Sequence, residues 1–169
     1  ASDVYKRQIP GKEAGSISSD DGTESDLYCY MQRRRRSVKK ERAVPRILLC
    51  APASGSGKTL ITCGILQALV NRGKKVASFK CGPDYIDPMF HGRVIGTKSR
   101  NLDTFFTDSN TTRYLFAENT ADCDLAVVEG VMGYFDGLGG VSTDGSTYDV
   151  ARTLSMPSVL IVNLSLIHI

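Results

Sequence analysis

The sequence lacks the features that mark secreted, zinc-binding and membrane proteins. It has no C-x-x-C pair and no secretory apolar segment, and its five cysteines are odd in number and scattered: Cys29, Cys50, Cys63, Cys81 and Cys123. Neither a disulfide framework nor a zinc site is indicated. No apolar run approaches the roughly 20 residues that a membrane span needs. We therefore expect a cytoplasmic protein with reduced thiols and no membrane partner.

Length and composition favour one ordinary globular domain. The chain has 169 residues, of which 41% are hydrophobic and 23% are charged. Such a chain is long enough for one core and too short for two comfortable ones. No internal repeat is visible.

The positive charge is concentrated in one short run. "RRRRSVKKER" at 33–42 has seven basic residues and one acidic residue, so a chain with a net charge of +3 carries −3 elsewhere. Such a run can bind nucleic acid or an acidic membrane, but most short charge blocks are solvated tails. We predict a tail over 1–44 and no nucleic-acid partner. Residues 1–8 and 165–169 fit no pattern, and two interpretations of them stay open: native sequence, or a cloning or assembly scar.

From residue 45 onward, short apolar runs alternate with helical patterns. The predicted strands are 46–51, 74–80, 124–130 and 157–163, and the predicted helices are 58–73, 109–120 and 146–155. Within these patterns Gly73 is expected to end the first helix, with Asp108 or Ser109 capping the second and Ser146 or Thr147 capping the third. This order predicts an α/β fold, a parallel sheet with helices on both faces.

A phosphate-binding loop follows the first predicted strand. "CAPASGSGKTLITCG" at 50–64 fits G-x-x-x-x-G-K-[ST] except that Pro52 replaces the first glycine. The glycines let backbone amides approach phosphate, the lysine reaches the β- and γ-phosphates, and the threonine hydroxyl binds Mg²⁺. The predicted nucleotide-binding residues are Ser54, Gly55, Ser56, Gly57, Lys58 and Thr59. The alternative is a tight turn with an accidental Gly-Lys-Thr.

Acidic residues at two later strand ends are further candidates. Glu129 ends the apolar run "LAVVE", where P-loop proteins hold Mg²⁺ or its waters. Lys80, Asp84 and Asp87 lie in "FKCGPDYIDPMFHG" at 79–92, which we interpret as a loop stiffened by two prolines. A solvated glutamate and ordinary turn capping are the alternatives. His91 is interpreted as structural.

A long glycine-rich loop is expected at 129–151. Loops of this length in compact domains are usually functional or mobile. Asp136 is its strongest candidate side chain, and the alternative is a solvated loop residue.

Four segments together resemble one enzyme family. "APASGSGKT", "ASFKCGPDYIDPMFH", "SRNLD" and "VEGVMGYFDG", in this order, closely resemble the N-terminal synthetase domain of the cobyrinate a,c-diamide synthases. The similarity runs from about Arg46 to Asn163. The resemblance implies a P-loop fold like that of dethiobiotin synthetase, followed in the family by a glutaminase domain.

The resemblance also implies the chemistry. ATP activates the a and c acetates of cobyrinic or hydrogenobyrinic acid as acyl phosphates, and ammonia derived from glutamine displaces phosphate. The phosphate-binding loop would bind ATP, and Thr59, Glu129 and Asp84 would bind Mg²⁺. Lys80, Asp84, Asp87 and Asp136 would be catalytic, with the division of labour among the three aspartates left open.

The chain departs from the family in extent. It stops soon after the last predicted strand, and none of its cysteines lies in a G-x-C-x-G-like sequence, so glutamine hydrolysis is not expected here. We interpret 45–169 as the N-terminal part of the amidoligase domain, with the sheet incomplete and the glutaminase absent. We expect the isolated chain to be inactive or very weak.

Two rival assignments are retained. Related amidases, namely cobyric acid synthase and sirohydrochlorin a,c-diamide synthase, fit the same segments. A partitioning-type ATPase switch is the rival from another class, but its K-G-G-x-G-K-T signature requires a lysine where this sequence has Ala53.

Overall fold

The computed structural model describes residues 44–164, which form a five-stranded sheet with all strands parallel. The strands are β1 (Arg46–Cys50), β2 (Val76–Cys81), β3 (Lys98–Leu102), β4 (Leu125–Glu129) and β5 (Ser158–Leu160). They are arranged in the order β3-β2-β4-β1-β5. Outside the described residues lie the predicted tail apart from residue 44, the basic run at 33–42, and the two segments without a pattern, 1–8 and 165–169.

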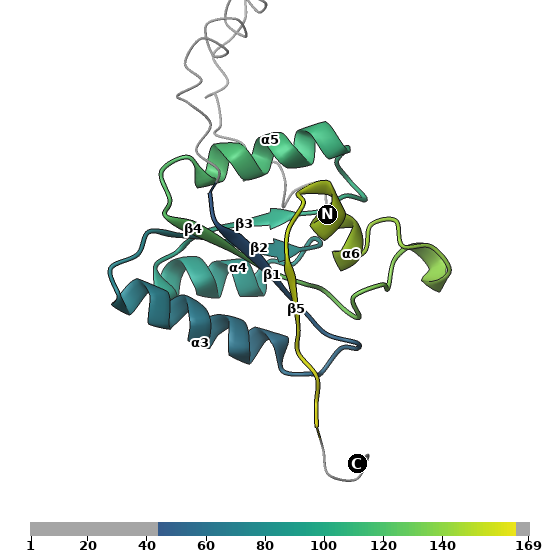
Figure 1. Ribbon diagram of the computed structural model, residues 1–169, viewed down its shortest axis with the longest axis horizontal. Coiled ribbons are helices and arrows are strands. Elements are labelled where there is room, and N and C mark those ends of the chain that lie inside the picture. Colours follow the sequence, from purple (N-terminus) through teal and green to yellow (C-terminus); the bar gives the residue numbers. More distant parts are fainter. Residues whose placement is uncertain (1–43, 165–169) are drawn as a thin grey trace, which may run out of the picture. The chain divides into compact units, whose positions relative to one another are not determined.

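Helices cover both faces of the sheet, as predicted. They are α3 (Lys58–Asn71), α4 (Ile86–Phe90), α5 (Ser109–Thr120) and α6 (Thr147–Thr153), with a π-helical turn η1 (His91–Ile95) and a 3₁₀ turn η2 (Leu138–Gly140). Figure 1 shows α3 and α4 on one side of the strands and α5 on the other. One buried cluster contains Phe116 of α5 and Val150 of α6, and the other contains Leu66 of α3 and Ile95 of η1.

The strand β3 was not predicted, because "KSRNL" has neither an apolar run nor an alternating pattern. It is an edge strand that pairs only with β2 within the described sheet, and only its last two residues are buried. An edge strand with one covered end tolerates polar side chains, so its composition resembles that of a loop.

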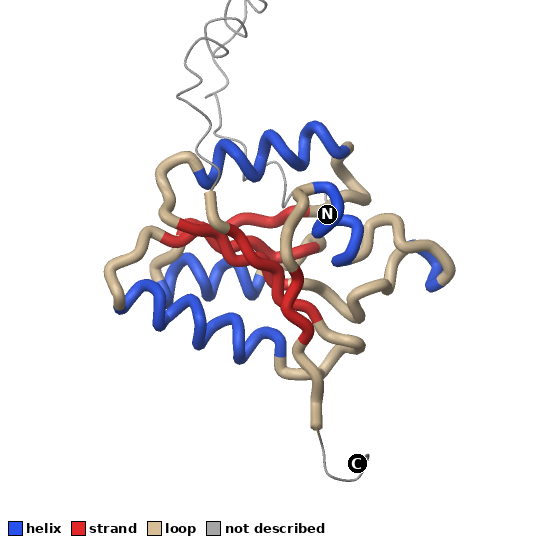
Figure 2. The backbone as a smooth tube through the Cα atoms, viewed as in Figure 1, coloured by secondary structure: helices blue, strands red, loops and turns tan. Residues whose placement is uncertain are grey.

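The interpretation of 79–92 as a loop was also wrong. The segment continues β2, turns at 82–85, and then forms α4 and the start of η1, which Figure 2 shows as helix. Pro88 is the third residue of α4, where its missing N–H costs no helical hydrogen bond. The prolines therefore mark a short helix rather than an extended stiff loop.

The helix termini follow the predicted capping. Gly73 has φ 72° and closes α3 with bonds from its own N–H to the Val70 carbonyl and from the Lys74 N–H to the Leu69 carbonyl. This is the Schellman arrangement, for which glycine is favoured. Asp108 caps α5 and Ser146 caps α6. Within 44–164, no helix has the length and apolar character that crossing a membrane requires.

Removal of the α6 cap should lower stability measurably. Ser146 is fully buried, accepts from the Asp149 N–H and donates to the Thr143 carbonyl. We expect Ser146→Ala to reduce the free energy of unfolding by about 0.5–2 kcal/mol. Ser109→Ala at the first residue of α5 is the control, with an expected change within about 0.5 kcal/mol. Urea unfolding measures both, and equal losses would contradict the assigned cap.

Candidate functional site

The predicted site residues meet at the carboxyl ends of three neighbouring strands. β4 lies between β1 and β2, and Lys80 of β2 is in register with Glu129 of β4. The segments that follow these strands line an open cavity of about 430 Å³. Its lining includes Ser54, Gly55, Gly57, Lys58, Thr59, Leu60, Lys80, Asp84, Gly130, Val131 and Met132. Ligands of open parallel sheets bind at this edge.

The alternation of side chains along β4 explains the direction of the Glu129 side chain. Val127 packs in the cluster that contains Leu66 of α3. Since alternate residues of a strand share one face, Glu129 points to the same face, where α3 begins. The carboxylate at the end of β4 therefore lies beside the first turn of α3.

The loop between β1 and α3 has the geometry of a phosphate-binding loop. Gly55 and Gly57 have φ of 78° and 84°, which favours glycine, and α3 begins directly at Lys58. The Lys58 Nζ donates to the Ala53 carbonyl at 3.1 Å and to the Met132 carbonyl at 2.6 Å. Burial lowers the pKa of Lys58, and the charge of Lys80 acts in the same direction. An anion in the cavity would counter both effects.

Ser56 is the exception among the predicted loop residues. Its hydroxyl donates back to the Ala53 carbonyl at 2.9 Å, and the side chain is not part of the cavity lining. Leu60, an apolar residue in the first turn of α3, is 79% exposed and lies at the cavity.

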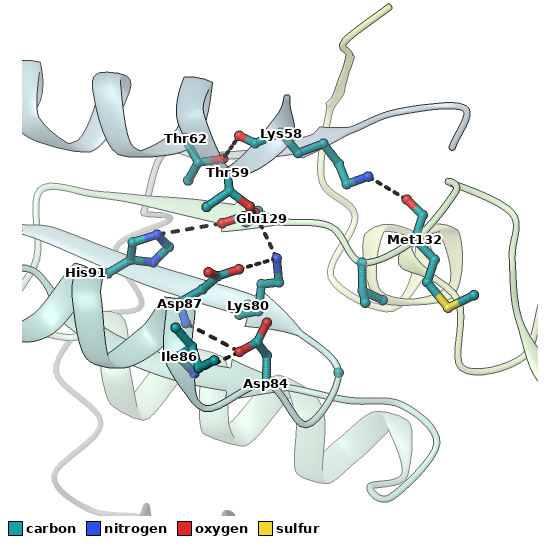
Figure 3. A network of polar contacts seen from close by, with 12 residues as sticks. Lys58, Thr59, Thr62, Lys80, Asp84, Ile86, Asp87, His91, Glu129 and Met132 are labelled. Carbon is teal, nitrogen blue, oxygen red and sulfur yellow. Dashed lines mark hydrogen bonds and ion pairs between the residues drawn. The ribbon is translucent and has the colours of Figure 1, made fainter. Parts of the chain in front are cut away.

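Glu129 is the centre of a buried polar network (Figure 3). Its Oε1 accepts from the Thr59 hydroxyl at 2.6 Å and from the Lys80 Nζ at 2.7 Å. The Lys80 Nζ also lies 2.6 Å from Asp87 Oδ2. Burial alone would lower the pKa of Lys80, but hydrogen bonds to Asp87 and Glu129 outweigh it and raise the pKa. Lys80 therefore remains a cation inside the site.

The oxygen atoms of this network suit a hard cation. The Thr59 hydroxyl and the Glu129 carboxylate lie side by side at the start of the helix. No group of three or more His, Cys, Asp or Glu residues placed to hold a metal occurs within residues 44–164. Mg²⁺ typically uses one or two carboxylates together with substrate phosphates, and not a cage of protein ligands. The residues present fit such a shared site.

The three candidate aspartates occupy different positions. Asp84 Oδ1 accepts from the N–H groups of Ile86 and Asp87, the first two residues of α4, which is the turn-capping role given above as the alternative. Asp84 also lines the cavity. Asp87 pairs with Lys80. Asp136 accepts from the Gly133 N–H at 2.8 Å within its own loop, and its charge acts on Lys58 to raise that pKa.

Two side chains near the site were not assigned a role from the sequence. Asn101 of β3 donates to the Gly82 carbonyl at 2.8 Å and to the Asp84 carbonyl at 2.6 Å, which fixes the turn that carries Asp84. The "SRNLD" segment was the only signal for it. His91, interpreted as structural, is fully buried with its Nε2 3.6 Å from Glu129 Oε2, and burial lowers the pKa of its imidazole.

The loop after β4 packs directly against the phosphate-binding loop. The Tyr134 N–H donates to the Ala51 carbonyl at 2.8 Å, and the Gly130 N–H donates to the Leu49 carbonyl at 2.8 Å. A Cβ atom on Gly133 would lie 2.5 Å from the Pro52 carbonyl oxygen. The Pro52 backbone therefore occupies space that only a glycine leaves free.

Comparison with known proteins gives consistent matches. The chain is 46% identical over 123 residues to "Hydrogenobyrinate a,c-diamide synthase" of Streptomyces coelicolor, covering 73% of this chain and 25% of the relative. It is 46% identical over 120 residues to "Cobyrinate a,c-diamide synthase" of Thermoplasma acidophilum, which covers 71% of this chain and 27% of the relative. A protein of that name from Methanocaldococcus jannaschii is 42% identical over 118 residues, which covers 70% of this chain and 26% of the relative. These matches confirm the predicted resemblance.

The chain spans about a quarter of the length of these curated relatives. A domain family described as "CbiA: CobQ/CobB/MinD/ParA nucleotide binding domain" matches residues 47–163, which include β2 to β5, all of β1 except Arg46, and the whole cavity lining. The chain therefore belongs to the CobQ/CobB/MinD/ParA nucleotide-binding domain family.

Proposed function

We propose that the chain is the nucleotide-binding part of an ATP-dependent ligase that amidates the a and c acetate carboxylates of cobyrinic or hydrogenobyrinic acid in cobalamin biosynthesis. The observation that carries the proposal is one cavity that contains Lys58, Thr59 and Lys80 beside the buried Glu129. The similarity to a,c-diamide synthases supports the substrate class. Residues 45–169 would be the N-terminal part of the amidoligase domain.

The proposed reaction has two steps. A substrate carboxylate oxygen attacks the γ-phosphorus of ATP, and ADP leaves, so that the carboxylate gains a leaving group. Ammonia then adds to the carbonyl carbon, and phosphate leaves with the original carboxylate oxygen as the amide forms. The protein contributes mainly placement and charge in such a transfer.

Each side chain has a proposed part in the first step. The amides of the phosphate-binding loop and Lys58 would hold the phosphates, and Thr59 and Glu129 would hold Mg²⁺, which neutralises phosphate charge when bound. Lys80 lies where it would stabilise charge on the transferred phosphoryl group. Asp84, which lines the cavity, is the proposed additional Mg²⁺ or substrate ligand. Asp87 would fix Lys80, and Asp136 would order the adjoining loop.

We propose glutamine as the source of ammonia. The sequence has no G-x-C-x-G segment, so glutamine hydrolysis is assigned to a part of the protein other than this chain. A reducing cytoplasmic setting is supported by the free thiols of Cys50, Cys63, Cys81 and Cys123. The rival ATPase switch is not favoured, because Ala53 contributes only its carbonyl where the switch proteins carry a lysine.

Nucleotide binding is the first test of this proposal. We expect the 169-residue chain to bind ATP with Mg²⁺ in a calorimetric titration, and Lys58→Met to weaken binding about 10- to 100-fold through loss of charge-assisted hydrogen bonds. Lys98→Met, which removes an exposed lysine paired with Asp122, is the matched control and should bind normally. Equal affinities in the two variants would contradict the assigned phosphate site.

Isotope transfer tests the reaction. The chain, or a longer protein that contains it, is incubated with MgATP, ammonia and cobyrinic acid carrying ¹⁸O in its carboxylates. Activation as an acyl phosphate moves ¹⁸O into inorganic phosphate, which mass spectrometry detects. Amide product with unlabelled phosphate would exclude the acyl phosphate route.

A further inference from the structure

His91 and Glu129 bring buried polar atoms that lack hydrogen-bond partners close to one another. Both side chains are fully buried, and their Nε2 and Oε2 atoms are 3.6 Å apart. Among the described residues, neither ring nitrogen of His91 nor Oε2 of Glu129 has a hydrogen-bond partner. Buried polar atoms of native proteins are nearly always paired, so each such atom needs an explanation.

The two oxygens of Glu129 are unequally held. Oε1 accepts from both Thr59 and Lys80, whereas Oε2 has no hydrogen-bond partner among the described residues and lies 3.6 Å from the His91 Nε2 (Figure 3). The terminal torsion of a glutamate is soft, so bonds to one oxygen alone do not fix the plane of the carboxylate. A donor on the second oxygen would fix that plane.

We propose that His91 is a positioning residue whose Nε2–H donates a hydrogen bond to Glu129 Oε2 and thereby holds Oε1 toward Thr59 and Lys80. The contact needs to shorten by only a few tenths of an ångström to reach hydrogen-bond length. In the tautomer with the proton on Nδ1, two lone pairs would face each other across this contact. The geometry therefore selects the Nε2–H tautomer.

Hydrogen bonds hold the backbone of His91 in place. The N–H and hydroxyl of Thr97 both donate to the His91 carbonyl at 3.0 Å, and the buried Ser78 hydroxyl lies 2.7 Å from the Thr97 hydroxyl. His91 begins the π-helical turn η1, a conformation found frequently at functional sites. These bonds fix the backbone of His91, and so fix the point from which its ring approaches Glu129.

The tautomer can be measured without any ligand. In the full 169-residue chain labelled with ¹⁵N-histidine, two-bond ¹H–¹⁵N spectra report which ring nitrogen carries the proton. His91 and His168 are the only histidines, and loss of one set of signals in His91→Gln assigns them. We expect the Nε2–H form for His91, with a ring ¹⁵N shift that changes in Glu129→Gln. An Nδ1–H tautomer would overturn the proposal.

The functional consequence rests on the proposed function, in which Glu129 holds Mg²⁺. The measured quantity is the ratio of the Kd values of fluorescent mant-ATP in EDTA and in Mg²⁺. Loss of a partner that orients a metal ligand typically weakens metal binding 10- to 100-fold. We therefore expect His91→Leu to lower the ratio about tenfold or more, with little change in EDTA, and His91→Gln, which keeps an amide donor, to restore most of it.

Thr120→Ala is the control for a purely structural effect. It removes a buried hydrogen bond from the Thr120 hydroxyl to the Phe116 carbonyl in α5, on the other side of the sheet from α3. We expect this variant to keep the wild-type ratio. An unchanged ratio in His91→Leu, or the same loss in Thr120→Ala, would show that His91 does not position the carboxylate. If the wild-type chain does not bind mant-ATP, the proposed function fails, and the tautomer measurement still decides the role of His91.

Discussion

Replacement of Lys80 by methionine should lower the free energy of unfolding by about 3–5 kcal/mol. Lys80 is 5% exposed and Glu129 is 0% exposed, so the two charges are buried together. Methionine fills similar space without a charge, which leaves the Glu129 carboxylate in the core without a cation and with the Thr59 hydroxyl as the remaining donor to Oε1. An uncompensated buried charge costs far more than the loss of an exposed ion pair.

Lys98→Met provides the matched comparison. The Lys98–Asp122 pair is 2.9 Å long, but its side chains are 36% and 71% exposed, so we expect a loss of about 0–1 kcal/mol. Urea unfolding followed by far-ultraviolet circular dichroism is suitable, because the chain has no tryptophan to serve as a fluorescent probe. If Lys80→Met loses no more stability than Lys98→Met, the buried pair is not what stabilises the site.

The outcome for Lys80 depends on contacts that the sequence only partly predicts. The phosphate-binding loop and the strand-end Glu129 were predictable, because strand, loop and helix are contiguous and each residue's role follows from its place in the chain. That Lys80 meets Glu129 needs the strand order, which puts β2 beside β4, and the register that aligns the two residues. Neither follows from composition or periodicity.

Contacts distant in sequence were the least predictable. His91 lies beside Glu129 because η1 packs with α3 on one side of the sheet, and no spacing rule relates the two residues. Likewise, Asp87 was expected on a loop, but it lies in the first turn of α4, from where it reaches Lys80. Short helices stabilised by tertiary packing carry little periodic signal, so their side-chain directions cannot be read before the fold is known.

Two glycine-to-alanine substitutions should have opposite effects on stability. Gly64 is in the middle of α3, where an added Cβ would meet nothing within 4 Å, so Gly64→Ala should stabilise the protein by about 0.5–1 kcal/mol. At Gly133 the added Cβ would lie 2.5 Å from the Pro52 carbonyl oxygen and 2.6 Å from Asp136 Oδ2. Backbone must move to relieve that overlap, so we expect a loss of about 1–3 kcal/mol.

The same substitution connects stability to the unusual first position of the phosphate-binding loop. Because the Pro52 carbonyl is the atom displaced, Gly133→Ala should shift this loop and weaken ATP binding, whereas Gly64→Ala should leave binding unchanged. Urea unfolding and calorimetric titration with MgATP on both variants separate the two effects. A Gly133→Ala protein that is destabilised but binds ATP normally would show that the loop tolerates the shift. Wild-type stability in Gly133→Ala would show that Pro52 and Gly133 are not closely packed, and proline at that position would then need no glycine opposite it.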